Sequence, residues 1–161
     1  MVENKPSNAP KSAPLTRSQI REIIPHGEAF LFLDEVTELE PGKRIVGRFA
    51  DLASGGHGDW VDAHFPNYPL VPGVILLEAL AQLGAVALLS MPENSGKIAM
   101  LGAVRRWRFR RAVPPGYPIK LEGQVIGMRG DFGRGHMKAV DDKGIVLAEG
   151  DISFALTARP V

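Results

Sequence analysis

One apolar segment constrains the fold of this chain more than any other feature. Residues 73–89 read GVILLEALAQLGAVALL, and Glu78 and Gln82 are their only polar side chains. Alanine and leucine favour helix, and a helix that is apolar on nearly every side belongs inside a protein and not on its surface. The segment is shorter than the roughly 20 apolar residues that cross a bilayer. We therefore predict a central helix, ended by Pro92, that the rest of the chain surrounds.

Stretches with the character of β-strands lie on both sides of this helix in the sequence. Turn signals such as Pro41-Gly42 and Asp141-Asp142-Lys143-Gly144 separate them. We expect strands at residues 30–39, 44–50, 98–109, 117–128, 132–140 and 145–156. Thr16 and Gln19 have the form of a capping box, which predicts a short helix that ends before Pro25. The predicted fold class is α+β, with an antiparallel sheet of about six strands wrapped around one long helix.

Length and composition place these elements in one domain. The chain has 161 residues, of which 45% are hydrophobic and 23% charged, as is typical of globular proteins. We expect a flexible tail at residues 1–14, a single domain at 15–157 and a short C-terminal tail at 158–161. The first segment has no apolar core of the kind that a signal peptide needs, so we expect a cytoplasmic protein without a membrane segment.

Charge and cysteine content exclude several functions. The net charge of +1 argues against nucleic-acid binding through overall charge. The absence of cysteine removes disulfides, thiolate metal sites and a cysteine nucleophile.

The start of the predicted helix brings several reactive groups together. An unpaired carboxylate at Glu78 would be costly inside an apolar helix. Either a structural hydrogen bond or ion pair compensates it, or burial favours its protonated form, which can act as a general acid. Gln82, one turn further on, can orient that carboxyl. His64 precedes the proline-rich entry into the helix and is a candidate base, although a lone histidine is more often structural. Gly73 at the helix N-terminus leaves backbone N–H groups open to a carbonyl oxygen.

A base, an acid and an oxyanion site suit one reaction class in particular. That class is removal of a proton α to a carbonyl, with acid-assisted loss or addition of a group at the β position.

The segment that carries these groups resembles a known family signature. The pattern HFP-x-x-P-x-x-PGV-x-x-x-EA-x-AQ is typical of the β-hydroxyacyl-acyl carrier protein dehydratases of type II fatty acid synthesis, in the branch whose acid is Glu. The matching residues are His64-Phe65-Pro66, Pro69, Pro72-Gly73-Val74, Glu78-Ala79 and Ala81-Gln82. Two further stretches resemble the same family: Pro25-His26 with residues 30–34, and residues 108–110 with Pro115-Gly116. The resemblance covers residues 18–157.

The resemblance implies a fold, an assembly and a set of roles. It implies a hot-dog fold and a homodimer whose active sites straddle the interface, with a trimer of such dimers common in the family. His64 of one chain would then face Glu78 of the other. His64 would be the base, Glu78 the acid at the β-hydroxyl and the Gly73 amide the donor to the thioester carbonyl. Substrate-tunnel residues would be Phe65, Pro66, Val74 and Gln82. The implied substrate is carried on the phosphopantetheine of acyl carrier protein, and no other cofactor is expected.

The chain departs from the family pattern at several positions. Ala63 and Asn67 stand where glycines are usual around the HFP motif, and the loop at residues 51–62 replaces a shorter run. Arg105 stands where an aspartate is common. None of these changes removes a catalytic group. They leave acyl chain length and the pathway, housekeeping or specialised, open.

Five arginines lie within seven residues, at positions 105, 106, 108, 110 and 111. We favour docking of an acidic acyl carrier protein and of the phosphate on its arm. Strand alternation would put Arg106, Arg108 and Arg110 on one face for that purpose. A solvated strand face and a nucleic-acid surface are the alternatives.

Other readings of the sequence stay open. His57, Asp59, Asp62 and His64 crowd one segment, but their spacing fits no recognised metal motif, so we expect no metal site. His26 and His136 carry no partner signal, and a structural role near the first strand suits His26. A hot-dog thioesterase and a non-catalytic subunit that binds carrier protein are the alternatives to a dehydratase.

Overall fold

The computed structural model describes residues 13–54 and 60–159. Most of the expected N-terminal tail and residues 55–59 lie outside the described part. The α-helices are α1 (Arg17–Ile23), α2 (Trp60–Ala63) and α3 (Gly73–Leu89), and short 3-10 helices are η1 (Glu28–Phe30), η2 (Leu52–Ser54) and η3 (Pro92–Asn94). The strands are β1 (Leu15–Thr16), β2 (Leu33–Glu40), β3 (Arg44–Phe49), β4 (Lys97–Phe109), β5 (Lys120–Arg129), β6 (Phe132–Val140) and β7 (Val146–Ala158).

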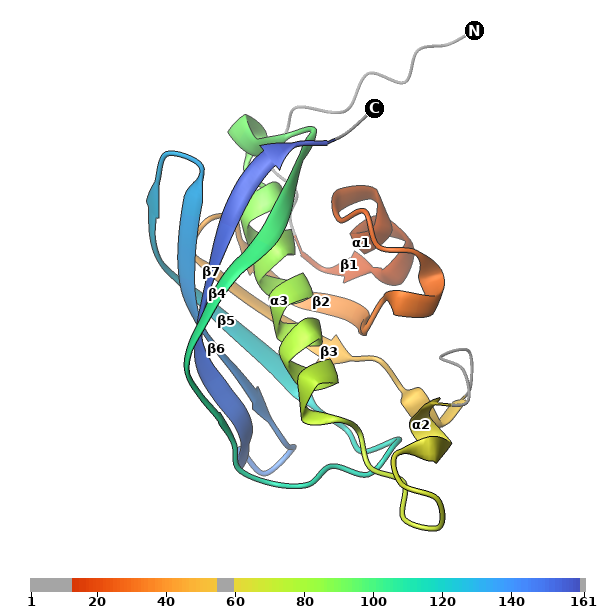
Figure 1. Cartoon of the computed structure of the whole chain (residues 1–161). Coiled ribbons are helices and arrows are strands. Elements are labelled where there is room, and N and C mark those ends of the chain that lie inside the picture. Colours follow the sequence, from red (N-terminus) through yellow and green to blue (C-terminus); the bar gives the residue numbers. More distant parts are fainter. Residues whose placement is uncertain (1–12, 55–59, 160–161) are drawn as a thin grey trace, which may run out of the picture.

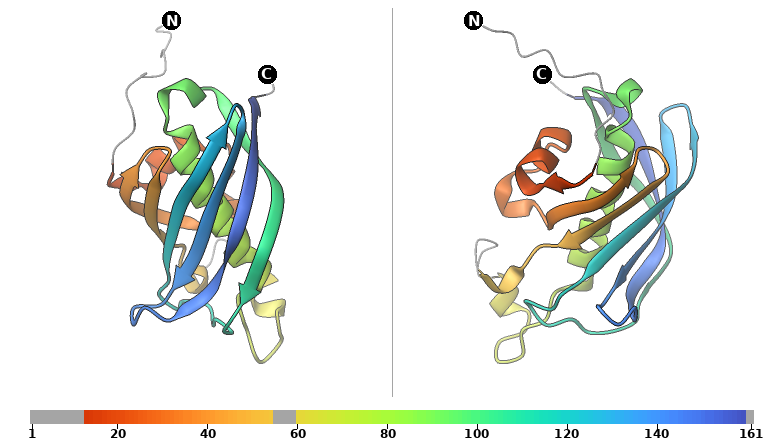
Figure 2. Two further views of the ribbon diagram at one scale, coloured as in Figure 1. Left: turned by 90° about the vertical axis from the view of Figure 1, so that its left-hand side faces the viewer. Right: turned by 180° about the vertical axis from the view of Figure 1, so that it is seen from behind.

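The strands form one antiparallel sheet in the order β1-β2-β3-β5-β6-β7-β4. The sheet curves around α3, which lies along its concave side (Figures 1 and 2). The edges of the sheet are β1 and β4. The predicted α+β architecture, with a sheet wrapped around one long helix, is confirmed.

The sheet has seven strands where the sequence predicted about six. The additional strand is β1, whose two residues pair with Val36 and Glu35 of β2. The stretch expected to begin a strand at residue 30 starts with η1 instead, and β2 begins at Leu33. The strand β7 continues to Ala158, one residue into the expected C-terminal tail.

The first helix is capped as the sequence predicts. The Gln19 backbone N–H donates to Thr16 Oγ1, and the Thr16 N–H donates to Gln19 Oε1 at 2.9 Å. These two bonds satisfy N–H groups that a helix start leaves without partners. The helix ends at Ile23, before Pro25.

The core lies between α3 and the concave face of the sheet. Its fully buried members on these elements include Ile45, Leu80, Leu83, Leu121, Met137 and Ile152. The helix and the sheet approach so closely that glycine is needed on both sides. A Cβ at Gly47 would lie 2.9 Å from Leu83 Cδ1, and one at Gly84 would lie 2.9 Å from Phe154 Cε2.

The two halves of α3 are covered differently, which corrects the expectation of a helix surrounded throughout. Residues 79–89 are all buried. In the first two turns only Leu76 is buried, and Val74 is 63% exposed. None of the helices in the described residues combines the length and hydrophobicity that a membrane span requires.

Candidate active site

The Glu78 carboxyl lies on the second turn of α3, within reach of two polar side chains. Its Oε1 accepts a hydrogen bond from Gln82 Nε2 at 3.0 Å and lies 3.2 Å from His26 Nε2. The Glu78 side chain is 26% exposed. The carboxyl is therefore held by partners and still open on one side, and it is less enclosed than the sequence suggested.

Gln82 anchors this group to the backbone. Its Oε1 accepts from the Phe32 N–H at 2.9 Å, and its Nε2 donates to the Phe30 carbonyl at 2.8 Å. The side chain is buried. Gln82 thus orients Glu78, as predicted from their spacing of one helical turn. A tunnel lining role for Gln82 stays a prediction.

Sequence reasoning missed His26 as a site residue. The histidine follows α1 in the chain and reaches Glu78 from outside α3. A contact between residues so far apart in sequence has no periodic signal. The match of Pro25-His26 to the family's N-terminal segment was the one available indication.

His64 lies in the segment between α2 and α3, and its ring orientation is fixed. Its Nδ1 lies 2.9 Å from the Leu70 carbonyl oxygen, and the Leu70 N–H donates back to the His64 carbonyl at 2.6 Å. A carbonyl oxygen can only accept, so Nδ1 carries the ring proton. In the neutral ring Nε2 is then the basic nitrogen, which is the arrangement that a general base requires.

Gly73 begins α3 and lies against an aromatic ring. As the first helical residue it has an N–H that no earlier turn can accept. A Cβ at this position would lie 2.8 Å from Phe109 Cδ1. The helix start is therefore backed by Phe109, and a side chain larger than hydrogen would displace that ring.

A hollow of about 480 Å³ opens at the start of α3. His64, Gly73 and Val74 line it, and so do Arg110 and Arg111 of the predicted docking cluster and Phe109, to which the sequence analysis gave no site role. The structure thus brings the candidate base, the helix N-terminus and one predicted tunnel residue together.

Three other predicted site residues, Glu78, Phe65 and Pro66, do not line this hollow. Phe65 is stacked on His64 with ring centroids 4.2 Å apart, but it is exposed and does not line the hollow, and Pro66 is exposed next to it. Within one chain, His64 and Glu78 therefore belong to two separate groups.

The arginine-rich part of β4 contains a bulge. The register passes from Arg105 opposite Asp151 to Arg108 opposite Glu149, and Arg106 has a φ of +52°. Arg106 donates to Asp151, and Arg110 Nε donates to Glu149 at 2.8 Å. The bulge places arginines 105, 106, 108 and 110 over the same outer face of β7, whereas simple alternation would have turned Arg105 inward.

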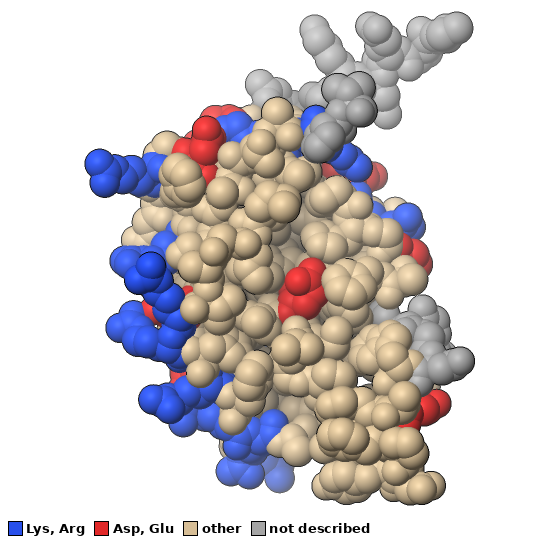
Figure 3. Space-filling view, viewed as in Figure 1, with Lys and Arg blue, Asp and Glu red and all other residues tan. Residues whose placement is uncertain are grey.

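These ion pairs affect the ionisation of both partners. The guanidinium of Arg106 and then the ring of His136 hold the pKa of Asp151 below its usual range. Hydrogen bonding to Asp151 raises the pKa of Arg106. Basic side chains gather along the side of the molecule where the strands of this sheet lie, while the face over α3 is mainly neutral (Figure 3).

Two of the four residues that the sequence analysis considered and rejected as a metal site lie outside the described residues. His57 and Asp59 lie outside them. Within residues 13–54 and 60–159, no three histidine, aspartate or glutamate side chains are grouped so that they could hold a metal ion.

Comparison with known proteins places this site in a family. A model of the FabA-like domain matches residues 24–151. The 3-hydroxyacyl-(acyl-carrier-protein) dehydratase FabZ of Clostridium novyi is 47% identical over 138 residues, which cover 86% of this chain and 94% of the relative. The FabZ of Bacillus subtilis is 43% identical over 142 residues, covering 88% and 98%. The chain belongs to this dehydratase family.

Two solved structures resemble the fold of this chain. The dehydratase heterocomplex ApeI:P from Xenorhabdus doucetiae matches with a TM-score of 0.71 at 16% identity, over 92% of this chain and 94% of that one. A hypothetical thioesterase with coenzyme A from Streptococcus pneumoniae matches with a TM-score of 0.59 at 10% identity, over 79% and 88%. At such identities the likeness concerns the fold alone. The hot-dog fold implied by the family signature is confirmed.

One departure from the family signature has a local explanation. Asn67 stands where a glycine is usual, and its φ is +66°. Phe65 and Tyr68 on either side exchange two backbone hydrogen bonds, of 3.0 and 2.9 Å. Asparagine is the residue that best tolerates this left-handed conformation after glycine. Asn67 therefore permits the tight turn after His64.

Proposed function

We propose that this protein removes water from (3R)-3-hydroxyacyl-acyl carrier protein to give the trans-2-enoyl thioester, with His64 as base and Glu78 as acid. One observation carries the proposal. Relatives that are 43% to 47% identical over almost their whole length bear the name of this dehydratase. The orientation of His64 and the partners of Glu78 support the assignment of roles.

The reaction needs two proton transfers and one stabilised oxygen. His64 Nε2 takes the proton from the α carbon, and the electron pair of that C–H bond forms the new double bond. Glu78 gives a proton to the β-hydroxyl, whose C–O bond breaks as water leaves. The Gly73 N–H donates to the thioester carbonyl, where negative charge develops in the transition state. Because side chains and backbone supply these steps, the proposal requires only the phosphopantetheine arm that carries the acyl group.

We also propose that two chains complete each site. In one chain the base and the acid belong to separate groups, and the first two turns of α3 are incompletely covered. The edge strand β4 exposes Met100, Leu101, Val104 and Phe109, an apolar surface of the kind that marks interfaces. Pairing of two such edges would bring the partner's carboxyl toward His64, and a trimer of these dimers is the larger assembly that we expect.

Acyl carrier protein is the partner we propose for the arginine face. Arg108 of β4 lies opposite Glu149, Arg110 just after β4 donates to the same Glu149, and Arg110 and Arg111 also line the hollow beside His64. An acidic carrier docked over Arg106, Arg108 and Arg110 would have its phosphate near the mouth of that hollow. A cytoplasmic location remains a prediction.

Turnover of carrier-bound substrate tests the function. We expect absorbance of the enoyl thioester to rise when purified protein meets 3-hydroxyacyl carrier protein. His64→Ala and Glu78→Gln should each abolish the rise while the circular dichroism spectrum and Tm are unchanged. Release of free thiol instead of enoyl product would indicate a thioesterase. Binding of carrier protein without turnover would indicate a non-catalytic subunit.

Mixed dimers test whether the site is shared between chains. His64→Ala and Glu78→Gln chains, each inactive, should regain activity when they are refolded together. A random mixture contains one intact site per heterodimer, which amounts to about a quarter of the wild-type sites. Failure of the mixture to recover, with mixed dimers detected by mass spectrometry, would place both groups in one chain.

A further inference from the structure

The orientation of Gln82 determines which oxygen of Glu78 can carry a proton. The Phe32 N–H can only donate and the Phe30 carbonyl can only accept, so these two contacts distinguish the oxygen of the Gln82 amide from its nitrogen. The second N–H of that nitrogen donates to Glu78 Oε1. The carbonyl oxygen of a neutral carboxyl accepts more strongly than its hydroxyl oxygen, so this bond favours the proton of a neutral Glu78 on Oε2.

The surroundings of His26 determine its tautomer. Its Nδ1 is buried and has no hydrogen-bond partner among the described residues. A proton on that nitrogen would be a buried donor without an acceptor, which folded proteins avoid more strongly than an unused acceptor. The Nε2 atom lies 3.2 Å from Glu78 Oε1, an oxygen that already accepts from Gln82. A neutral ring with its proton on Nε2 satisfies both conditions.

We propose that His26 is a positioning residue of this dehydratase. Its Nε2 lies 3.2 Å from the Glu78 Oε1 that accepts from the Gln82 amide, and in this proposal an Nε2–H is the second donor that keeps this oxygen an acceptor. The transferable proton of Glu78 is thereby kept on Oε2. His26 contacts the acid and not the substrate, so its effect on the reaction passes through Glu78.

The inference rests on the proposed role of Glu78 as the acid, and it specifies which of the two carboxyl oxygens carries the transferable proton. A carboxylic acid has two oxygens, and only a proton on the oxygen that faces the β-hydroxyl is productive. With Gln82 and His26 both donating to Oε1, the form with the proton on Oε1 is disfavoured in the ground state, which is a form of preorganisation. When the proton has left, the same two donors stabilise the negative carboxylate.

Substitutions of His26 separate this role from a structural one. The side chain of His26→Gln offers an N–H donor of similar reach, whereas His26→Leu fills the space without a donor. We expect His26→Leu to lower kcat on the order of tenfold or more with little change in KM, and His26→Gln to restore most of that loss. His136→Leu is the matched control, because His136 contacts Asp151 on the opposite side of the sheet, and it should keep wild-type kcat.

The assay uses 3-hydroxybutyryl and 3-hydroxydecanoyl carrier protein with the full chain, and thermal unfolding verifies each variant. An inactive wild type would refute the proposed function and not the inference. Wild-type kcat in His26→Leu, or equal losses in His26→Leu and His26→Gln, would overturn the inference.

A spectroscopic measurement tests the tautomer without turnover. Nitrogen-15 NMR of histidine-labelled protein distinguishes the Nε2–H form from the Nδ1–H form. In the neutral rings we expect the proton of His26 on Nε2 and that of His64 on Nδ1, with the His26→Gln spectrum assigning the signals. A neutral His26 with its proton on Nδ1 would overturn the proposal even if His26→Leu did not fold.

Discussion

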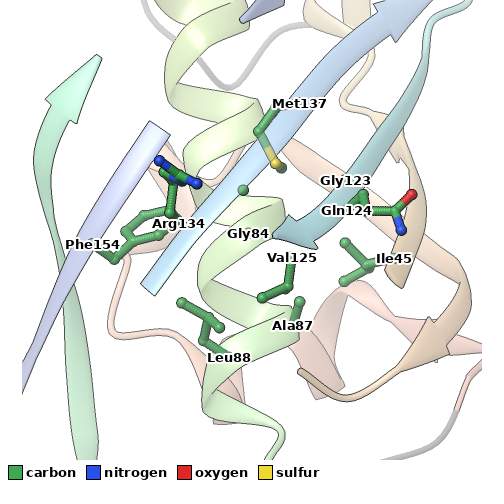
Figure 4. A pocket seen from close by; sticks show the side chains of 11 residues that line it. Ile45, Gly84, Ala87, Leu88, Gly123, Gln124, Val125, Arg134, Met137 and Phe154 are labelled. Atoms are coloured by element: carbon green, nitrogen blue, oxygen red, sulfur yellow. The ribbon is translucent and has the colours of Figure 1, made fainter. Parts of the chain in front are cut away.

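The two halves of α3 are equally apolar in sequence and differ in what surrounds them. Residues 79–89 are buried against the sheet. The hollow beside Gly84 and Leu88 has a volume of about 10 Å³, room for about one water (Figure 4). Residues 73–78 are mostly half exposed, and the hollow at their end measures about 480 Å³. Residues 79–89 of α3 are thus covered by other parts of this chain, whereas much of the surface of residues 73–78 remains exposed.

The difference in burial between the two halves of α3 shows how one apolar helix can contribute both to the core and to a site. Burial of residues 79–89 and of Leu76 holds the helix, so the other residues of the first two turns need not be enclosed by this chain. Their polar groups, the Glu78 carboxyl and the Gly73 N–H, can then face substrate on an otherwise apolar surface. If the comparison is right, substitutions in the first half change activity and substitutions in the second change stability.

The largest expected effect is in the first half. Glu78→Gln should lower kcat by about 10²- to 10⁴-fold, the range typical of a lost general acid. The amide oxygen can still accept from Gln82, so Tm should stay within about a degree of the wild type. Steady-state kinetics and calorimetry on the same sample measure both. A large fall in Tm would mean that Glu78 is needed for folding, and the comparison would then fail.

The second half should respond in the opposite way. Leu83 is fully buried beneath the sheet, so Leu83→Ala should cost about 2 to 5 kcal/mol of unfolding free energy. Urea denaturation measures this cost, and kcat per folded molecule should be retained. Ile126→Ala, which removes an exposed apolar side chain of β5, is the control and should cost about 0.5 kcal/mol or less. Equal costs for the two variants would contradict the burial described.

Sequence patterns predicted the elements well and the polar contacts poorly, for a physical reason. Periodicity and turn residues are local, so the six longer strands, the capped α1 and α3 were all predictable. The Glu78–Gln82 contact was predictable because it spans one helical turn. The His26–Glu78 contact joins two segments through tertiary packing, which no spacing encodes. The exposure of Val74 and the bulge at Arg106 likewise depend on how the whole sheet curves.

The same substitution in each half of α3 sharpens the comparison. Gly84→Ala places a Cβ 2.9 Å from Phe154 Cε2, inside a packed core, and should cost about 1 to 3 kcal/mol. Gly73→Ala places a Cβ 2.8 Å from Phe109 Cδ1, on a side chain that is 52% exposed in the single chain and not part of the packed core. We expect Gly73→Ala to keep Tm and to lower kcat, because the displaced ring borders the hollow beside His64. Calorimetry and turnover assays measure both effects in both variants. A greater loss of Tm in Gly73→Ala than in Gly84→Ala would contradict the view that the first half of α3 serves activity and the second half stability.

The smallest effect concerns a carboxylate whose role is structural, in contrast to Glu78. Asp141 accepts hydrogen bonds from the Ile145 and Lys143 N–H groups and from the Tyr117 hydroxyl.

The hydrogen bond from the Ile145 backbone N–H contributes most to lowering the pKa of Asp141 from its ordinary value of 3.8. A carboxyl with a depressed folded-state pKa adds stability that is fully present above its unfolded value and disappears as pH falls through the folded one. Tm should therefore fall less steeply below pH 3.8 in Asp141→Asn than in the wild type, although its Tm near neutral pH is lower. Asp142→Asn, at the exposed neighbouring position, is the control and should keep the wild-type curve. Identical acid dependence in Asp141→Asn and the wild type would show that the turn does not couple to the ionisation of this carboxylate.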